Sequence, residues 1–554
     1  MELLDSRRLT GPNLYADAVG VIAEIVDADP VRAIAAWRGE LARILAALGW
    51  STAAVHARAY AGGAALFFTA PLDVLLPATE VNEWAVASAA SLLAGEPPLE
   101  LEPALAVLRP AIEQARRPAV VALRTAAFVR DIPMILDDEG LTLGWGHRGI
   151  TYALDQLPDV VDVPWARLGA IPVALVTGTN GKTTTTRLVA RMVRLAGHHV
   201  GNTSSDGVSI DEQFVVRGDW SGPDAARMVL RNPAVEVAIL EVARGGILRR
   251  GLAVERCAAA LITNVTNDHL GSYGVDDLAT MARVKAVVGR NAGSVVLNAD
   301  DPALVALASE LPGPIVYFTR ATDSVVVAAH RAAGGQAWLA RGGQLVHARG
   351  AIEASVIAID DVPLTFRGRA GYNVENALAA AALATELGLP ADAIVRGLRE
   401  FTSSSDDNRG RGNLHDVGGV RVMIDFGHNP AAVRGVLGLA RALVGAGRLF
   451  VTVGLPGDRP DAEIVAVAHE LAAAHPAHAF VLELADYLRG RAPGAVPRLI
   501  RTTLAEAGMP AAAISEASGE PDALRQALAI ARPGDLVLVL AHVDDAALAL
   551  LPHP

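Results

Sequence analysis

The chain has 554 residues, enough for about three domains, and 52% of them are hydrophobic. A formal net charge of −12 without a basic stripe disfavours nucleic acid as the main partner. The single cysteine, Cys257, excludes an intrachain disulfide and suggests a small buried side chain in a reducing cytoplasm. We expect no signal peptide and no membrane segment, because apolar runs of the required length are missing from the sequence.

Residues 1–130 mix helical and strand patterns and predict an α+β domain. The pattern predicts helices over 30–48 and 81–93, with strand material over 53–68. Prolines recur and periodicity weakens over 131–170, which we interpret as a linker. This stretch contains Gly144-Trp145-Gly146-His147-Arg148-Gly149, which satisfies the dinucleotide-binding pattern. Its approach is turn-like, so a glycine-rich connection is the better interpretation, with a cofactor loop as the alternative.

A second unit over 171–408 opens with a phosphate-binding loop. Gly178-Thr179-Asn180-Gly181-Lys182-Thr183-Thr184 lies between a buried strand and an amphipathic helix. Backbone N–H groups and the helix N-terminus suit a polyphosphate, Lys182 can reach the outer phosphates, and Thr183 can offer its hydroxyl to Mg²⁺. Val176 stands where the common spacing has another glycine, so the loop is a shortened variant. Simple helix capping is the alternative interpretation.

Further strands of this unit are expected over 235–240 and 258–263, with a helix over 373–387. Residues 315–366, rich in short β-prone runs, predict an extra sheet inserted in the unit. Residues 409–554 alternate strands with helices, which is typical of a small parallel-sheet, Rossmann-like domain. The fold class expected is therefore α/β.

Glu241 ends a buried strand, where a carboxylate can share Mg²⁺ with Thr183. Asp268 and His269 leave the next strand and could bind a second metal or orient a carboxylate. Taken one at a time, a solvated strand end and a structural histidine remain the alternatives.

Six motifs together resemble the Mur ligases and folylpolyglutamate synthetases. They occur in the order and spacing of those families over about 390 residues: Thr177 to Thr184, Glu241, Asn267-Asp268-His269, Asn298-Ala299-Asp300-Asp301, Tyr372-Asn373-Val374-Glu375-Asn376 and Asp425-Phe426-Gly427-His428-Asn429-Pro430. The resemblance implies a Mur-ligase central ATP-binding domain over 171–408 and a Mur-ligase C-terminal domain over 409–554.

Other segments are similar to cyanophycin synthetases in particular. These are Arg8 to Tyr15 in the N-terminal domain, Glu241 to Arg249, Gly454 to Arg459 and Leu488 to Arg491. That family carries an ATP-grasp module between its N-terminal and Mur-type modules. Here the phosphate-binding loop follows about twenty residues after the segment 131–150, so the sequence indicates a relative lacking that module.

The resemblance implies roles for individual residues. Lys182, Glu241, His269 and Lys285 would form the catalytic set, and Lys285 falls where several Mur ligases carry a carbamylated lysine. Thr183, Glu241 and His269 would hold Mg²⁺. The implied nucleotide contacts are Gly178, Thr179, Asn180, Gly181, Lys182, Thr183, Thr184, Asn298, Arg411, Asp425 and His428. The implied substrate contacts are Ser221 at the acceptor carboxylate, and Asp458 and Arg459 at the incoming amino acid.

The implied activity is ATP-dependent ligation of an amino acid, arginine or another basic one, to a peptide or polymer carboxylate through an acyl phosphate. Because both domains supply nucleotide contacts, we expect ATP to close one against the other. We also expect a homo-oligomer, and either action on a different peptide or cooperation with a separate ATP-grasp enzyme that builds the peptide backbone. The alternative is a non-catalytic ATP- or polymer-binding subunit of a complete synthetase. A simple ATPase or kinase would leave the domain over 409–554 unexplained.

Overall fold

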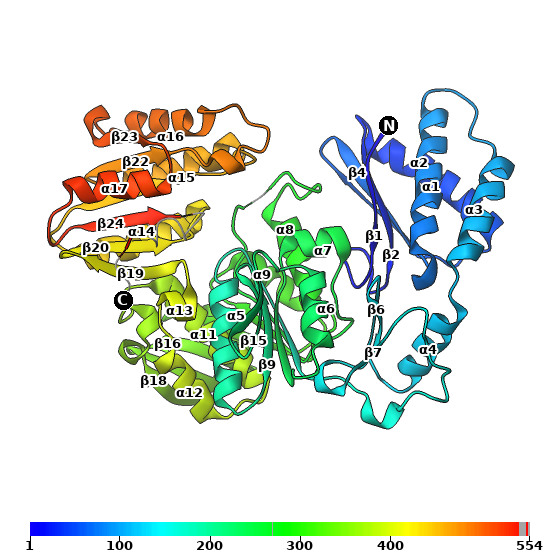
Figure 1. The fold of residues 1–554 in the computed structure, drawn as a ribbon, viewed down its shortest axis with the longest axis horizontal. Helices are drawn as coiled ribbons and strands as arrows, with labels where there is room; N and C mark the ends of the chain where they lie inside the picture. Colours follow the sequence, from blue (N-terminus) through cyan, green and yellow to red (C-terminus); the bar gives the residue numbers. More distant parts are fainter. Residues whose placement is uncertain (269, 542–549, 552–554) are drawn as a thin grey trace.

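The computed structural model describes residues 1–268, 270–541 and 550–551. Figure 1 shows the N-terminal region on the right, the large central sheet in the middle and the C-terminal region on the left. In the described part of the chain, no helix has the length and apolarity needed to cross a membrane.

The N-terminal region contains a four-stranded antiparallel sheet in the order β1-β2-β4-β3, packed against helices. The strands are β1 (Glu2–Leu9), β2 (Gly20–Val26), β3 (Val55–Tyr60) and β4 (Gly63–Thr69), and the helices are α1 (Pro30–Leu48), α2 (Leu75–Leu93) and α3 (Leu101–Ala115). Trp37 lies fully buried in this core and donates from Nε1 to Asn82 Oδ1 at 2.9 Å. The helix expected over 30–48 is α1 with the same bounds, whereas α2 begins six residues before the expected start at 81.

The segment for which we expected a linker contains a small sheet with its own apolar cluster. After α4 (Pro118–Val129), β5 (Met134–Asp137), β6 (Gly140–Leu143) and β7 (Ile150–Tyr152) form an antiparallel meander. The glycines of the dinucleotide-like pattern lie in the turn between β6 and β7. A Cβ on Gly146 would meet the Val235 carbonyl at 2.2 Å, and the His147 N–H donates to that carbonyl at 2.9 Å. These glycines therefore let the turn pack closely against the central region.

The central sheet has eleven strands in the order β11-β10-β9-β12-β8-β13-β14-β15-β16-β17-β18. Its bounds are β8 (Val173–Thr177), β9 (Val200–Ser204), β10 (Gly207–Ile210), β11 (Gln213–Arg217), β12 (Val237–Glu241), β13 (Ala259–Ile262), β14 (Val295–Asn298), β15 (Ile315–Thr319), β16 (Gln336–Arg341), β17 (Gln344–Arg349) and β18 (Ile352–Ala358). The strands from β9 to β16 are parallel, and antiparallel strands extend both edges. The expectation of a separate sheet over 315–366 is wrong, because β15 and β16 pair in parallel with this sheet.

Helices cover both faces of the central sheet. One face packs against α5 (Lys182–Leu195), α11 (Gly371–Glu386) and α12 (Ala391–Glu400). The other packs against α6 (Pro223–Arg231), α7 (Arg244–Arg250), α8 (Leu278–Ala286), α9 (Pro302–Leu307) and α10 (Val325–Ala332). Cys257 contacts this second core. Two buried faces explain why the central strands read as continuous apolar runs rather than as alternating ones.

The C-terminal region is a six-stranded sheet in the order β19-β20-β24-β21-β22-β23, parallel except for β19. It follows the short helix α13 (Ser405–Asn408) and comprises β19 (Arg411–Val417), β20 (Val420–Asp425), β21 (Leu449–Val453), β22 (His478–Leu482), β23 (Ile514–Ala517) and β24 (Leu536–Leu540), with α14 (Pro430–Val444), α15 (Asp461–Ala473), α16 (Ala495–Glu506) and α17 (Glu520–Ile530). The loop after β20 reaches the phosphate-binding loop of the central sheet.

Candidate active site

The phosphate-binding loop joins β8 to α5, and the end of β13 fixes its shape. Gly178 has φ +149°, and a Cβ there would meet Thr263 Oγ1 at 1.8 Å. Asn264 accepts the Asn180 N–H at its Oδ1 and the Thr179 N–H at its carbonyl, both at 2.9 Å. Since a larger residue at Gly178 would push the loop off this support, the glycine is required by close approach.

Lys182 and Thr183 are the first two residues of α5, directly after the glycines of the phosphate-binding loop. Lys182 Nζ donates to the Thr179 carbonyl at 3.0 Å, so the ammonium group lies over the loop. Thr183 Oγ1 donates to Glu241 Oε2 at 2.9 Å and lies 2.9 Å from Ser205 Oγ. The hydroxyl and carboxylate expected to share Mg²⁺ are therefore adjacent, and Ser205 is a third oxygen that the sequence did not indicate.

Burial dominates the electrostatics around Glu241. It raises the pKa of Glu241, although the nearby Lys182 and the hydrogen bond from Thr183 act to lower it. A buried carboxylate beside hydroxyl oxygens is the hard-oxygen donor set that Mg²⁺ prefers, so these residues fit the ion, which would neutralise charge on the phosphates. In the part of the chain that the structure describes, no group of three His, Cys, Asp or Glu side chains forms a metal cluster.

Lys285 on α8 is buried close to the same charges. Burial, assisted by the charges of Lys182 and Arg244 and opposed by that of Asp268, lowers the pKa of Lys285 to about 7. His269, expected to bind a second Mg²⁺, lies outside the described residues. A neutral amine is the form of lysine that can react with CO₂, so the environment suits the modification that the resemblance implies.

Asn298, the expected adenine contact, ends β14 and is buried. Its Nδ2 donates to the Thr263 carbonyl at 3.1 Å, and its Oδ1 accepts the Asp300 N–H at 2.9 Å. Thr184 Oγ1, another expected nucleotide contact, is 3.3 Å from Asn408 Oδ1 in α13. Thr184 therefore ties α5 to the segment joining the central and C-terminal sheets.

The C-terminal region brings Arg411, Asp425 and His428 toward the loop. The Arg411 guanidinium lies 4.7 Å from the ring centre of Phe426. Burial raises the pKa of Asp425 to about 6 against the opposing charge of Arg411. Burial lowers the pKa of His428 to about 4, so its imidazole is neutral at pH 7.

A reciprocal amide pair links the two sheets directly at the phosphate-binding loop. Asn429 Nδ2 donates to Asn180 Oδ1 at 2.8 Å, and Asn180 Nδ2 donates back at 3.3 Å. Asn429 Oδ1 also accepts the Ala432 N–H at 3.0 Å and so caps α14. The sequence motif contained Asn429, but nothing local in the sequence indicated Asn180 as its partner.

Asp458 and Arg459, expected at the incoming amino acid, follow β21. Arg459 is buried, and its Nη1 lies 2.6 Å from Asp268 Oδ1 and 3.0 Å from Glu463 Oε2. Asp458 Oδ2 accepts from Arg489 Nη1 at 2.5 Å. In this structure Arg459 therefore joins the C-terminal and central regions, a contact that its sequence position did not reveal.

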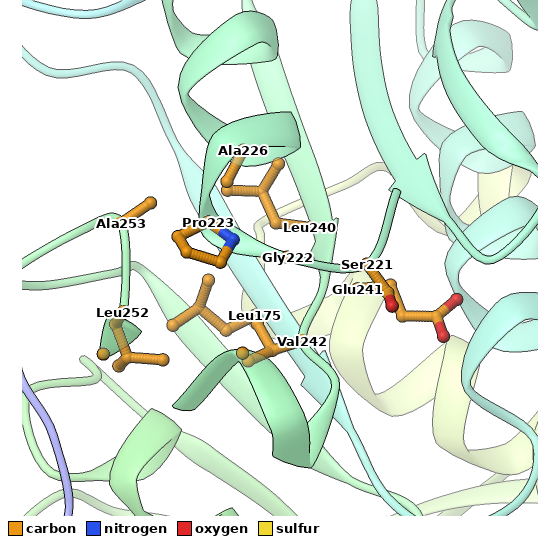
Figure 2. A pocket seen from close by; sticks show the side chains of 12 residues that line it. Leu175, Ser221, Gly222, Pro223, Ala226, Leu240, Glu241, Val242, Leu252 and Ala253 are labelled. Carbon is orange, nitrogen blue, oxygen red and sulfur yellow. The ribbon is translucent and has the colours of Figure 1, made fainter. Parts of the chain in front are cut away.

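Ser221 lies on the loop before α6, at the edge of a small apolar pocket. Figure 2 shows the Glu241 carboxylate beside Ser221, with Leu175, Leu240 and Pro223 lining the rest. Ser221 Oγ donates to Asp219 Oδ1 at 2.7 Å, and its carbonyl accepts the Ala243 N–H at 3.1 Å. The loop expected to hold the acceptor is thus fastened to the chain that follows Glu241.

A phosphate-binding loop, an acidic strand end and a second α/β sheet beside them are the arrangement found in the ATP-dependent carbon–nitrogen ligases of the Mur type. Residues 176–384 match the Mur ligase middle domain, and residues 410–543 match the Mur ligase glutamate ligase domain. The chain belongs to the Mur ligase family, and the expected fold class is confirmed.

Among curated relatives, the cyanophycin synthetase of Synechocystis sp. is 38% identical over 384 residues, which are 69% of this chain and 43% of that protein. The cyanophycin synthetase of Geminocystis herdmanii is 38% identical over 372 residues, 67% of this chain and 42% of that protein. The expected resemblance is confirmed, and the chain spans less than half the length of these relatives.

Solved structures show the same fold. Folylpolyglutamate synthase of Mycobacterium tuberculosis, complexed with ADP and AMPPCP, has a TM-score of 0.50 at 20% identity and covers 69% of this chain and 92% of that one. E. coli FolC in complex with ADP also has a TM-score of 0.50 at 20% identity, covering 68% of this chain and 89% of that one.

Proposed function

We propose that this chain joins a basic amino acid, arginine first among the candidates, to a carboxylate of an acidic peptide. Hydroxide is a poor leaving group, so the carboxylate must first be activated. Its oxygen attacks the γ-phosphorus of ATP, ADP leaves, and the resulting acyl phosphate is attacked by the amine, which releases phosphate and a proton.

The observation that carries this proposal is the meeting of the two sheets at the phosphate-binding loop. The Asn180–Asn429 amide pair and the Arg459–Asp268 ion pair hold the C-terminal loops against the nucleotide cradle. An ATPase needs only the cradle. A ligase also needs a surface that presents the amine to the activated carboxylate and excludes water, which this contact supports.

The residues fit the roles that this chemistry requires. Lys182 would stabilise negative charge on the phosphates, and Thr183 with Glu241 would hold Mg²⁺ against them. The Asp458 carboxylate accepts a hydrogen bond from the guanidinium of Arg489. The Asp461 carboxylate accepts one from the guanidinium of Arg491, with 2.6 Å between Oδ1 and Nη1. These two carboxylates are therefore suited to a basic amino acid, which would displace an arginine of the chain's own loop.

The test combines ATP, Mg²⁺, single amino acids and acidic peptides with the full chain. We expect phosphate release that requires both amino acid and peptide, together with a product heavier than the peptide by one amino-acid residue. Lys182→Ala should lower the rate at least about 100-fold by removing charge stabilisation at the phosphates. Phosphate release without a new amide, or turnover unchanged in Lys182→Ala, would contradict the proposal.

We further propose a homo-oligomer, and a separate ATP-grasp enzyme that supplies the peptide backbone. Mass photometry of the full chain tests the first point. For the second, an acidic peptide from another source should replace that enzyme in the assay. If the chain binds ATP and peptide but never turns over, the non-catalytic subunit becomes the better interpretation.

A further inference from the structure

A cleft of about 750 Å³ separates β1 and α2 of the N-terminal region from the segments around α6 and α7. A volume of this size is typical of a ligand site. The polar and charged residues that line it are Asp5, Ser6, Arg7, Arg8, Thr79, Asp219, Ser221, Asp224, Arg249 and Arg250. Figure 1 shows β1 beside α7, the two elements that carry its four arginines.

The two walls are joined by backbone contacts. The Thr10 N–H donates to the Arg250 carbonyl at 2.7 Å, and the Leu252 N–H donates to the Pro12 carbonyl at 2.7 Å. A Cβ on Gly11 would lie 1.9 Å from the Leu252 carbonyl oxygen, so only glycine permits this approach. The two walls of the cleft therefore approach each other most closely beside Gly11.

The carboxylates of the cleft are already engaged. Asp5 pairs with Arg7 at 2.6 Å, and Asp224 pairs with Arg227 at 2.8 Å. Asp219 accepts the hydrogen bond from Ser221 and keeps its negative charge, which three arginines of the cleft, unpaired among the described residues, outweigh. Arg7 also meets Glu24 at 2.6 Å, so its charge is balanced within the N-terminal region.

Three arginines of the cleft remain uncompensated. Arg8 lies on β1, and Arg249 and Arg250 are exposed in the last turn of α7. The structure gives their side chains no ion pair with any residue it describes. Ser6 Oγ, also on this lining, is buried without a hydrogen-bond partner among the described residues. The surface is therefore prepared for an anion longer than a single carboxylate.

The cleft leads to the candidate active site. Ser221, Gly222 and Pro223 line both this cleft and the small pocket that contains Glu241 (Figure 2). An extended ligand can therefore lie against the arginines while one of its groups reaches Ser221. The reaction proposed above needs a carboxylate at that end, which favours a ligand that carries carboxylates along its length.

We propose that this cleft binds the acidic peptide acceptor, with Arg8, Arg249 and Arg250 holding carboxylates remote from the one that reacts. The inference rests on the proposed ligase function and adds that the N-terminal region supplies part of the acceptor site. Guanidinium groups pair with carboxylates in a planar, bidentate manner, so each can select a carboxylate over an amide.

The experiment measures binding of a fluorescein-labelled aspartate decamer to the full chain by anisotropy, without ATP. We expect Arg8→Gln/Arg249→Gln/Arg250→Gln to raise the Kd at least about tenfold and to flatten its dependence on salt. The lysine counterparts of these three changes keep the charge and should retain most of the affinity. A decamer of asparagine should not compete for the site.

A matched control removes the same charge elsewhere. Arg38→Gln/Arg399→Gln/Arg498→Gln changes three exposed arginines far in sequence from the cleft and should leave the Kd within about twofold. Equal losses in the two triple variants would mean that net charge, not the cleft, binds the peptide, and would overturn the inference. Tighter competition by inorganic polyphosphate than by the unlabelled decamer would overturn the peptide assignment.

The peptide-binding cleft and the ligase activity are tested by different measurements, so one proposal can be wrong while the other holds. Peptide affinity is measured without nucleotide, so it tests the cleft even if no ligation occurs. Dependence of turnover on Lys182 tests the ligase even if the arginine variants bind normally. In the ligase assay, the cleft variant should raise the KM for peptide about tenfold and leave the KM for ATP unchanged, because no cleft arginine contacts the phosphate-binding loop in the described structure.

Discussion

Arg58 of β3 fastens the N-terminal region to the central loop that follows Asp268. Its Nη2 donates to the Tyr273 carbonyl at 2.7 Å, and its Nη1 donates to the Gly274 carbonyl. Tyr273 has φ +56°, a left-handed conformation that costs a non-glycine residue of order 1–3 kcal/mol. Such strain persists only where neighbouring contacts enforce it. The turn is closed by backbone hydrogen bonds from the Val275 N–H to Ser272 and from the Gly271 N–H to Val275, and the Arg58 guanidinium adds its two hydrogen bonds from outside the turn.

The cost of Arg58→Ala follows from these two bonds. A hydrogen bond to a charged group contributes about 1.5–3 kcal/mol net, so two are worth about 3–6 kcal/mol before the loop relaxes. Because water can replace part of each bond and Tyr273 can release its strain, we take about 3 kcal/mol. At 1.4 kcal/mol for each factor of ten, local opening of the loop should become roughly 100-fold more frequent.

Hydrogen–deuterium exchange of the full chain measures this opening. Peptides covering residues 270–276 should lose about two orders of magnitude of protection in Arg58→Ala, while the sheet of β1 to β4 keeps its own. Arg58→Lys, which can reach only one carbonyl at a time, should fall between. Arg38→Ala on α1 changes an exposed arginine of the same region and should have no effect. Unchanged protection at 270–276 in a folded Arg58→Ala protein would refute the reasoning.

Three further predictions concern the buried charges of the site. Burial raises the pKa of Asp425 from 3.8 to about 6, so the folded state takes up a proton between these pH values and loses stability as the pH rises through them. Asp425→Asn should therefore raise the free energy of unfolding of the nucleotide-free protein by roughly 2–3 kcal/mol at pH 8 and leave it unchanged near pH 4, as urea unfolding at both pH values measures. The same variant should bind ATP more weakly, as a nucleotide titration measures. If Asp425→Asn were instead less stable than the parent protein at pH 8, the attraction between Arg411 and the Asp425 carboxylate would outweigh the cost of burying that charge, and the prediction would be wrong. Glu241→Gln should lower kcat at least about 100-fold and abolish the dependence of nucleotide affinity on Mg²⁺. Nucleotide affinity measured in EDTA should stay unchanged. If the affinity still depended on Mg²⁺, Glu241 would not be a ligand of the metal. Burial lowers the pKa of Lys285 to about 7, so most of the amine is neutral at pH 8 and should add CO₂ as a carbamate; ¹³C NMR with labelled bicarbonate should show a carbamate signal that Lys285→Gln lacks, and equal spectra would exclude the modification.

Elements set by local pattern could be predicted from the sequence. The helix over 30–48 has the expected bounds, because short-range hydrophobic periodicity and Pro30 at the helix start determine them. β1 was not predicted, since its first four residues are exposed and carry two charges, and only pairing with β2 makes it a strand. The route of β15 and β16 into the central sheet likewise depends on pairing that no local window contains.

The site shows the same division. The phosphate-binding loop carries its chemistry within seven consecutive residues, so the sequence alone indicated it. Arg459 could be placed in a functional loop, but its partner Asp268 is 191 residues away in the chain, and Asn180 and Asn429 are 249 apart. Pairing across such distances is a property of the docked sheets and leaves no local signal.

Asp268 and the nearby loop at Tyr273 are held from two sides by different parts of the chain. Arg58 holds the Tyr273 carbonyl from the N-terminal region, and Arg459 holds Asp268 from the C-terminal region. Arg7 lines the cleft proposed for the acceptor peptide, and its guanidinium lies 5.2 Å from the ring centre of Tyr273. Filling of the cleft and closure of the C-terminal sheet on ATP therefore act on neighbouring segments of one loop. If each steadies that loop, each lowers the cost of the other, and linkage requires the effect to be reciprocal. Bound peptide should then tighten ATP binding by the same factor as ATP tightens peptide binding, and Arg58→Ala should reduce both factors together.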